Sequence, residues 1–573
     1  MKDNWLIKEQ FPERSAELAK ELKMKSIVGQ LLINRGIDTD EKAEEFFKSS
    51  FVDLPSPFLM AGMEEAVARM VKAVEGGETV AVYGDYDADG VTATSLLCDF
   101  LRALGVEAIY FAPHRIRDGY GVNDRAVEEL GRKGATLIVS TDCGISAVRE
   151  VKTAKQSGID FIITDHHLPG DTLPDAVAIV NPKLPDCRYP AKNIAGVGVA
   201  FNLALALRAR LRENGFFDSR EEPNMARYLD LVAIGTVTDR VPLEGVNRIM
   251  VKEGLRRMVV SDRPGIEALK RVSRINWPPT SSDIGFRMGP RINAAGRIGE
   301  PETAVDLLLC ESSKSAAKMA RRLDEQNRDR QRLEGEALEE ALSMIEDDPA
   351  NAERACVVLA SKDWHPGIIG PLASKLVERY SKPVFTIAIG KYGVGKGSGR
   401  TVAGVNLHEA LKTCGGALSE YGGHAMAAGI TVSNKNIDAF RDAFDEYVRS
   451  SAAPEAKPGR TLEIDAKVSV ADLSVEMVKQ VETLGPFGSG NPTPVFLVEG
   501  AVVVSHEIMR DVHLKLAIGR GGGEETIEAM WWNAAGRGGR APEDEVNMVV
   551  TPEVRRWRDR EFVALRVEDL EEM

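Results

Sequence analysis

The chain has few cysteines, and they are not arranged to hold a metal or to cross-link the fold. Six cysteines are spread over 573 residues, and no two of them form a CxxC pair. Structural zinc sites and disulfide frameworks both use closely spaced cysteines, so this distribution counts against either and favours a reducing compartment. A chain of this length can bury several hydrophobic cores without such cross-links.

The sequence also lacks a long hydrophobic run. The longest nearly apolar stretch, residues 197–207, contains Asn202 and is too short to cross a bilayer. The first residues, MKDNWLIKEQFPERS, contain no apolar segment of the kind found in signal peptides. We therefore expect a soluble, cytoplasmic protein.

Positive charge is in deficit, because 73 Lys and Arg face 87 Asp and Glu and the net charge is −14. Nucleic-acid backbones are bound through Lys and Arg, so this balance taken alone counts against a nucleic-acid partner. The objection is weak. An acidic exterior can coexist with one basic groove, and carboxylates gathered around metal ions add negative charge of their own.

The residues that are present predict a multidomain α/β protein. At roughly 150 residues per domain, the length corresponds to about four domains. Residues 1–50 have a helical pattern, whereas residues 51–310 begin with short apolar runs that alternate with amphipathic segments. That alternation is typical of a parallel, doubly wound sheet with buried strands. The expected strands are residues 79–84, 108–113, 136–140, 161–164 and 176–180.

The second half of the chain predicts a connecting helix, another α/β lobe and a barrel. Residues 311–346 contain no proline and a single glycine, which favours one long helix between two lobes. Residues 347–450 return to alternating strands and helices. After a linker at residues 450–459, residues 460–573 contain several short strand-like runs separated by turns, as in a small OB-like β-barrel.

Acidic and imidazole side chains follow the predicted strands of the first lobe. The segment GDYDADG places Asp85, Asp87 and Asp89 directly after the first strand, and Asp142 follows a later one. The ends of parallel strands meet at one edge of a sheet, where ligands bind. One such acidic segment alone is more often a turn or a helix cap, but its recurrence at the same edge favours a shared site.

Two more motifs extend this pattern. Asp165, His166 and His167 follow the strand expected at residues 161–164, and the segment GTVTD ends in Asp239. Oxygen ligands with one or two imidazoles suit Mn²⁺ or Mg²⁺. Five or six carboxylates exceed the needs of one ion, so we expect two ions, a pair that typically hydrolyses phosphoesters.

The successive motifs resemble a known superfamily. GDYDADGVTAT, STDCGIS, TDHH and GTVTD resemble those of the DHH phosphoesterases, and GGHAMAAG resembles the signature of the domain that accompanies them. The segments PHRIRDGYG, RINAAGRIGEP, KDWHPGIIG, GSGR and GPFGSGNPTPVF are similar to one branch, the RecJ exonucleases specific for single-stranded DNA. The resemblance covers essentially the whole chain in order. It implies a DHH catalytic domain at residues 51–310, a DHH-associated, substrate-binding domain at residues 347–450 and a nucleic-acid-binding OB-fold at residues 460–573.

The resemblance also implies roles for individual residues. The positions that hold or support two metal ions match Asp85, Asp87, Asp89, Asp142, His166 and Asp239. The implied catalytic residues are Asp87, Asp89, Asp142, His166, His167 and Asp239, with His167 close to the scissile phosphate, while Asp165 orients a histidine. Arg115, Arg291, Arg297, Ser398, Arg400 and His424 are candidates to bind a 5′-terminal phosphate and the adjoining backbone. For each arginine, an ordinary surface ion pair stays an equal alternative.

The implied function is a metal-dependent exonuclease that degrades single-stranded DNA from its 5′ end to mononucleotides, in DNA repair and recombination. The expected cofactor is Mn²⁺ or Mg²⁺, the expected partner is single-stranded DNA, and we expect a monomer. A helicase and a single-strand-binding protein are left open as partners. The alternatives are another DHH phosphoesterase that cleaves short oligonucleotides, cyclic dinucleotides or polyphosphate, and a non-catalytic DNA-binding replication scaffold.

Overall fold

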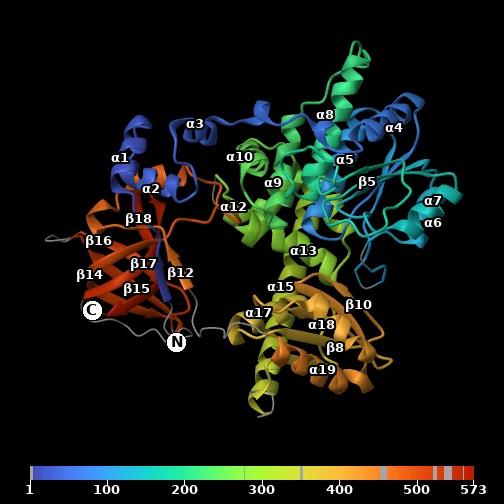
Figure 1. Cartoon of the computed structure of the whole chain (residues 1–573). Coiled ribbons are helices and arrows are strands. Elements are labelled where there is room, and N and C mark those ends of the chain that lie inside the picture. Colours follow the sequence, from blue (N-terminus) through green and yellow to red (C-terminus); the bar gives the residue numbers. More distant parts are fainter. Residues whose placement is uncertain are drawn as a thin grey trace.

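The computed structural model describes the chain except for residues 1–3, 116, 120, 276–277, 349–352, 452–460, 521–524, 535–544, 559 and 573. The described residues form two α/β lobes joined by a long helix, and a β-barrel beside them (Figure 1). This arrangement confirms the predicted fold class. None of the described helices is long and apolar enough to cross a bilayer.

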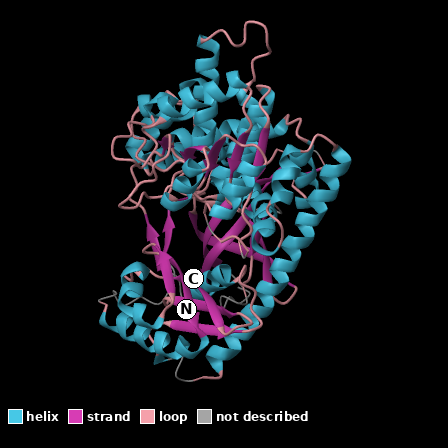
Figure 2. Cartoon of the chain, turned by 90° about the vertical axis from the view of Figure 1, so that its right-hand side faces the viewer, coloured by secondary structure: helices cyan, strands magenta, loops and turns pink. Residues whose placement is uncertain are grey.

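The first lobe contains a five-stranded parallel sheet, with helices on both sides of the strands (Figure 2). In spatial order its strands are β3 (Ala108–Phe111), β2 (Val80–Tyr83), β4 (Leu137–Thr141), β5 (Asp160–Thr164) and β6 (Ala178–Val180). One face packs on α4 (Met63–Gly76), α5 (Ala88–Ala103) and α8 (Gly196–Glu213). The other face packs on α6 (Asp124–Arg132) and α7 (Val148–Gln156). Both faces are buried, which explains why the strands are continuous apolar runs.

The rest of this lobe is helical. It consists of α9 (Leu229–Thr238), α10 (Gly245–Val259), α11 (Pro264–Ser273), α12 (Ser281–Asp283), the π-helical turn η4 (Ile284–Met288), α13 (Gly289–Ile298) and α14 (Glu302–Leu309). Helix α9 packs against α5 and α8 beneath the sheet, and η4 packs against α9. The end of α9 therefore lies close to the start of α13.

The predicted connecting helix is present as α15 (Ser313–Glu346), with 34 residues. Its first half packs on α11 and α13, and Ala337 and Ala341 of its second half enter the core of the second lobe. That lobe has a five-stranded mixed sheet of β10 (Glu420–Gly423), β11 (Ala427–Ser433), β9 (Val394–Arg400), β8 (Val384–Ile389) and β7 (Val357–Ser361). Helices α17 (Ile369–Tyr380), α18 (Leu407–Cys414) and α19 (Ile437–Ser450) cover this sheet.

The C-terminal part forms a closed barrel. Its strands follow the order β13 (Ala466–Lys467), β14 (Phe496–Met509), β15 (His513–Gly519), β16 (Thr526–Trp531), β18 (Arg560–Glu572) and β17 (Glu545–Trp557), and β14 also pairs with β17. Helix α20 (Val475–Glu482) packs against β17 and β18. Because β14 bonds to both β15 and β17, the sheet closes on itself, as expected for an OB-like domain.

The N-terminal residues share the core of this barrel. Strand β1 (Asn4–Ile7) pairs in parallel with β12 (Thr461–Ile464). Helices α1 (Pro12–Glu21), α2 (Ser26–Ile33) and α3 (Asp40–Lys48) follow, and Leu31 and Leu32 are fully buried against barrel residues such as Phe496. We call residues 4–48 together with the barrel the barrel body.

The barrel body contacts the first lobe through Arg248 of α10. Its guanidinium donates hydrogen bonds to the carbonyl oxygens of Phe46 (3.1 Å) and Gly485 (2.8 Å) and lies 3.7 Å from the centre of the Phe46 ring. The hydroxyl of Ser281 donates to the carbonyl oxygen of Phe487. The barrel body is therefore attached beside α10 and α12.

We predict that Leu31→Ala destabilises the barrel body and leaves the first lobe intact. Removing a fully buried leucine side chain costs about 2–5 kcal/mol. Hydrogen exchange read by mass spectrometry should become faster in β14–β17 and stay unchanged in β2–β5. Leu6→Ala, at a side chain that is 53% exposed, is the matched control. Unchanged exchange in the barrel of Leu31→Ala would show that the N-terminal helices are not part of its core.

Candidate metal centre

The first acidic segment connects β2 to α5. Asp87 caps this helix, because its Oδ1 accepts hydrogen bonds from the backbone N–H groups of Asp89 (2.9 Å) and Gly90 (3.1 Å). A Cβ at Gly90 would lie 2.6 Å from the backbone nitrogen of Asp85, so only glycine lets the loop fold this closely onto the helix. The loop thereby holds three carboxylates at the carboxyl end of β2.

Asp89 is fixed from a second direction by the N-terminus of α8. The backbone N–H groups of Gly196 and Val197 donate to its two carboxylate oxygens at 2.6 and 2.8 Å. Asp142, which follows β4, has a left-handed φ of 62°. Non-glycine residues rarely adopt this conformation, and strain of this kind collects at functional sites. Asp142 packs closely on the start of α8, because a Cβ added at Gly196 would lie 2.6 Å from the Cβ of Asp142.

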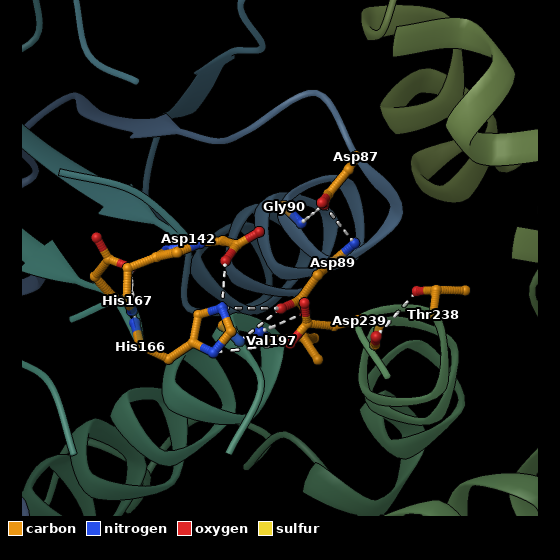
Figure 3. Close-up of polar contacts among 12 residues, drawn as sticks. Asp87, Asp89, Gly90, Asp142, His166, His167, Val197, Thr238 and Asp239 are labelled. Carbon is orange, nitrogen blue, oxygen red and sulfur yellow. Dashed lines mark hydrogen bonds and ion pairs between the residues drawn. The ribbon is translucent and has the colours of Figure 1, made fainter. Parts of the chain in front are cut away.

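His166 lies among the carboxylates (Figure 3). Its Nε2 is 3.0 Å from Asp142 Oδ1 and 3.9 Å from Asp89 Oδ2, and its Nδ1 is 3.7 Å from Asp239 Oδ2. Asp239 follows the last residue of α9, so the helical part of the lobe completes a site that the sheet begins.

Asp165 does not join this group. Its oxygens accept hydrogen bonds from the backbone N–H groups of Ile145, His166 and His167, and Oδ1 lies 2.8 Å from Nδ1 of His167. These contacts fix the imidazole of His167, which is 37% exposed, in one orientation. The contacts agree with the orienting role that the sequence implied for Asp165.

Three buried polar atoms of the site form no hydrogen bond with the described residues: Asp85 Oδ1, Asp142 Oδ1 and His166 Nε2. The last two lie 3.0 Å from each other, but this contact lacks hydrogen-bond geometry. An unsatisfied buried polar group costs about 1–3 kcal/mol, and more when it is charged. Such atoms are suited to bind an ion.

The side chains form three overlapping groups whose ligand atoms lie within 4.8 Å of one another. The groups are Asp85, Asp87 and Asp142; Asp89, His166 and Asp239; and Asp142, His166 and His167. Asp142 and His166 each belong to two of them. This overlap fits two divalent cations that share Asp142.

The pKa values of these groups show that the site opposes the ionisation of several neighbouring carboxyl groups. Burial, followed by the charge of Asp87, raises the pKa of Asp85 to about 8 and that of Asp239 to about 7. Burial and the charge of Asp89 also raise the pKa of Asp142 well above its usual value. Burial lowers the pKa of His166 to about 4, which leaves its imidazole neutral, the form that binds metals.

All six residues expected to hold metal lie in these groups, and His167 belongs to one of them as well. One contributor was missed. Asn293 of α13 accepts a hydrogen bond from the backbone N–H of Ala88 at 2.8 Å and so supports the acidic loop. It lies in the segment RINAAGR, between the two arginines that the resemblance indicated as phosphate-binding candidates.

A group of basic side chains lies beside the metal centre, at the contact between the two lobes. Arg115 lies over the ring of Tyr86 (5.2 Å), and Arg297 donates to the carbonyl oxygen of Gly367 (3.3 Å) in the second lobe. Arg400 donates to Ser398 Oγ at 3.2 Å. We call Arg115, Arg297, Ser398 and Arg400 the arginine cluster.

The arginine cluster is short of negative charge. Burial, followed by the charges of Arg115 and Arg330, lowers the pKa of Arg297 to about 10, and burial and Arg115 also lower the pKa of Arg400. Among the residues that the structure describes, none of the three arginines forms an ion pair with a carboxylate. Guanidinium groups held together in this way favour a phosphate between them.

Arg291 and His424 lie in other surroundings. Both Nε and Nη2 of Arg291 bind Asp324 of α15, at 2.9 and 2.8 Å, and its other donor contacts are to backbone carbonyls. These contacts join α13 to α15. His424 is exposed in the tight turn between β10 and β11. Phosphate binding by these two residues stays a prediction.

Comparisons with known proteins agree with this geometry. Family models described as the DHH family N-terminal domain, the DHHA1 domain and the RecJ OB domain match residues 79–236, 353–450 and 464–569. The chain is 36% identical over 576 residues to the single-stranded-DNA-specific exonuclease RecJ of Bacillus subtilis (strain 168), an alignment that covers 99% of this chain and 71% of that protein. It is 39% identical over 547 residues to the RecJ of Salmonella typhimurium, with 93% of each chain covered. The chain belongs to the RecJ family.

Solved structures of this family contain metal ions. The structure of RecJ from Thermus thermophilus in complex with Mn²⁺ matches all of this chain and 80% of that one, with a TM-score of 0.83 and 30% identity. The complex with Mg²⁺ has a TM-score of 0.78 and 29% identity and covers 100% of this chain and 78% of that one. Together with the donor atoms described above, these matches confirm the expected cofactor, Mn²⁺ or Mg²⁺.

We predict that Asp142→Asn stabilises the metal-free protein against heat and weakens its response to Mn²⁺. The amide keeps the shape of the side chain but removes a buried charge that neighbouring carboxylates repel. A ligand at one hundred times its Kd stabilises a folded protein by about 2.7 kcal/mol. The melting temperature, measured with and without MnCl₂, should rise less on Mn²⁺ addition in the variant than in the parent chain.

Asp511→Asn, at an exposed position in the barrel, is the matched control and should respond to Mn²⁺ as the parent chain does. An equal Mn²⁺ response in Asp142→Asn and the parent chain would refute Asp142 as a shared ligand.

Proposed function

We propose that this chain is a metal-dependent exonuclease that hydrolyses single-stranded DNA from its 5′ end to mononucleotides, in DNA repair and recombination. The observation that carries the proposal is the position of the arginine cluster relative to the metal centre. Helix α13 connects the two, because Asn293 supports the acidic loop and Arg297, one turn later on the same helix face, lies in the cluster.

The spacing along α13 supports cleavage after a single nucleotide. Four residues of helix span about 6 Å along the axis. A 5′ phosphate held by the arginine cluster would place the next phosphate of the strand at the metal centre. Cleavage there releases one nucleotide. A phosphate inside a long strand carries nucleotides on both sides, so it could enter the cluster only if the strand passed through the cluster.

The residues of the site divide the chemistry between them. When bound, the two ions supply a hydroxide nucleophile and stabilise the leaving oxygen. The carboxylates hold the ions in place. The pKa of His167 is raised, because the hydrogen bond and the charge of Asp165 outweigh the lowering effect of burial. Its imidazole is therefore suited to donate a hydrogen bond to the scissile phosphate.

The same proposal includes partners and location. The support for single-stranded DNA as substrate is the arginine cluster together with the relatives named for that activity. The proposal further includes a monomer in the cytoplasm that works beside a helicase and a single-strand-binding protein, supported by the family resemblance. The complete acidic set favours catalysis over the role of a non-catalytic scaffold.

The function is tested by incubating the protein and Mn²⁺ with a labelled strand of thirty nucleotides that carries a 5′ phosphate. We expect release of labelled mononucleotides by the parent chain and at least a thousandfold slower release by Asp142→Asn, which should still bind the strand. Absence of mononucleotides with the parent chain would refute the exonuclease. Faster cleavage of dinucleotides than of long strands would favour a short-oligonucleotide hydrolase.

We predict that Arg115→Ala reduces the preference for a 5′ phosphate over a 5′ hydroxyl by about tenfold or more, because a hydrogen bond to a charged group contributes about 1.5–3 kcal/mol. The measurement is kcat/KM on two strands that differ only at the 5′ end. Arg271→Ala removes an exposed arginine on α11 and serves as the control. An unchanged preference in Arg115→Ala would exclude Arg115 from the phosphate site.

A further inference from the structure

Helix α13 makes three functionally relevant contacts, one after another along its length. Near its C-terminal end, Arg297 joins the arginine cluster. In its middle, Asn293 supports the acidic loop of the metal centre. At its start, a Cβ on Gly289 would lie 2.2 Å from Thr238 Cγ2, so the N-terminal end lies against the end of α9, next to Asp239.

The turn before α13 exposes a large aromatic side chain. Within the π-helical turn η4, Ile284 and Met288 are fully buried, whereas Phe286 between them is 82% exposed. Gly285 packs beside Val237, and the backbone carbonyl of Arg287 accepts a hydrogen bond from Arg291. π-Helical turns are rare and occur frequently at functional sites. The turn is thus held in place from beneath while Phe286 faces solvent.

A basic side chain lies close to the same end of α13. Arg240 directly follows Asp239, is exposed and has a left-handed φ of 63°. Among the described residues, no carboxylate forms an ion pair with Arg240. This side of the metal centre therefore offers an exposed ring and an uncompensated positive charge, opposite to the arginine cluster along α13.

We infer that Phe286 stacks on a base of the DNA strand on the 3′ side of the scissile phosphate, with Arg240 beside the adjoining phosphate. The inference rests on the proposed function. A strand whose 5′ phosphate lies in the arginine cluster and whose next phosphate lies at the metal centre continues along α13 toward η4. A nucleobase is the one flat apolar surface that this strand can place on an exposed phenyl ring.

This subsite fits the needs of an exonuclease that removes any nucleotide in turn. Stacking on an aromatic ring tolerates every base, because each base has a π-face. A contact on the 3′ side remains with the enzyme after the mononucleotide leaves. Phe286 would therefore act as a positioning residue that holds the strand in register between successive cuts.

The test combines Phe286→Ala with abasic substrates. We expect Phe286→Ala to raise KM for a long 5′-phosphorylated strand roughly tenfold, the effect of losing one stacked base, with kcat little changed. In the parent chain, one abasic site moved stepwise through the first six positions should raise KM at one position beyond the cut. In Phe286→Ala that position should lose its effect, and Phe286→Trp should restore it.

Tyr392→Ala, which removes a 96% exposed ring in the second lobe, is the matched control and should behave as the parent chain. An abasic profile that is the same in Phe286→Ala and the parent chain would overturn the inference, and so would an equal loss of activity on dinucleotides. Failure of the parent chain to degrade the strand would instead refute the proposed function, so the two failures are distinguishable.

Discussion

The repulsion among buried carboxylates at the end of the first sheet is the constraint on which the site depends. Asp85, Asp89 and Asp142 are almost fully buried, and each has a raised pKa because burial and neighbouring charges oppose its ionisation. The fold brings them together through a glycine at the start of α5, the N-terminus of α8 and a left-handed residue after β4. Divalent cations reverse the sign of the local field, so the same arrangement that opposes the metal-free state binds the ions.

Helix α13 gives this site a direction. One of its faces supports the acidic loop and reaches the arginine cluster, and Arg291 on another face is held by Asp324 of α15. Since α15 continues into the second lobe, the ion pair ties the geometry of α13 to the contact between the lobes. The distance between the arginine cluster and the metal centre is therefore fixed by a rigid helix and not by a loop.

The sequence was most informative where local pattern and topology agree. Apolar strands followed directly by Asp85, Asp142 and His166 allowed the site to be predicted, because parallel strands of one sheet end at one edge. The different surroundings of the two arginines of RINAAGR could not be predicted from sequence alone, since Arg291 and Arg297 have the same chemistry. Six residues of α-helix turn the second side chain by about 240° relative to the first, so the two face different neighbours. Which neighbour each one meets depends on the packing of α15.

The location of the N-terminal helices could not be predicted from the sequence pattern either, because an apolar helix face does not indicate which surface it packs against. Here that surface is formed by the far end of the chain. The Trp5 indole N–H donates to the carboxylate of Asp569, 564 positions later. At ribosomal rates of about 5–20 residues per second, the strands that bury these helices are synthesised roughly half a minute to two minutes after the helices themselves. During synthesis the apolar faces of these helices therefore stay exposed for longer than those of helices that pack against residues close to them in the sequence.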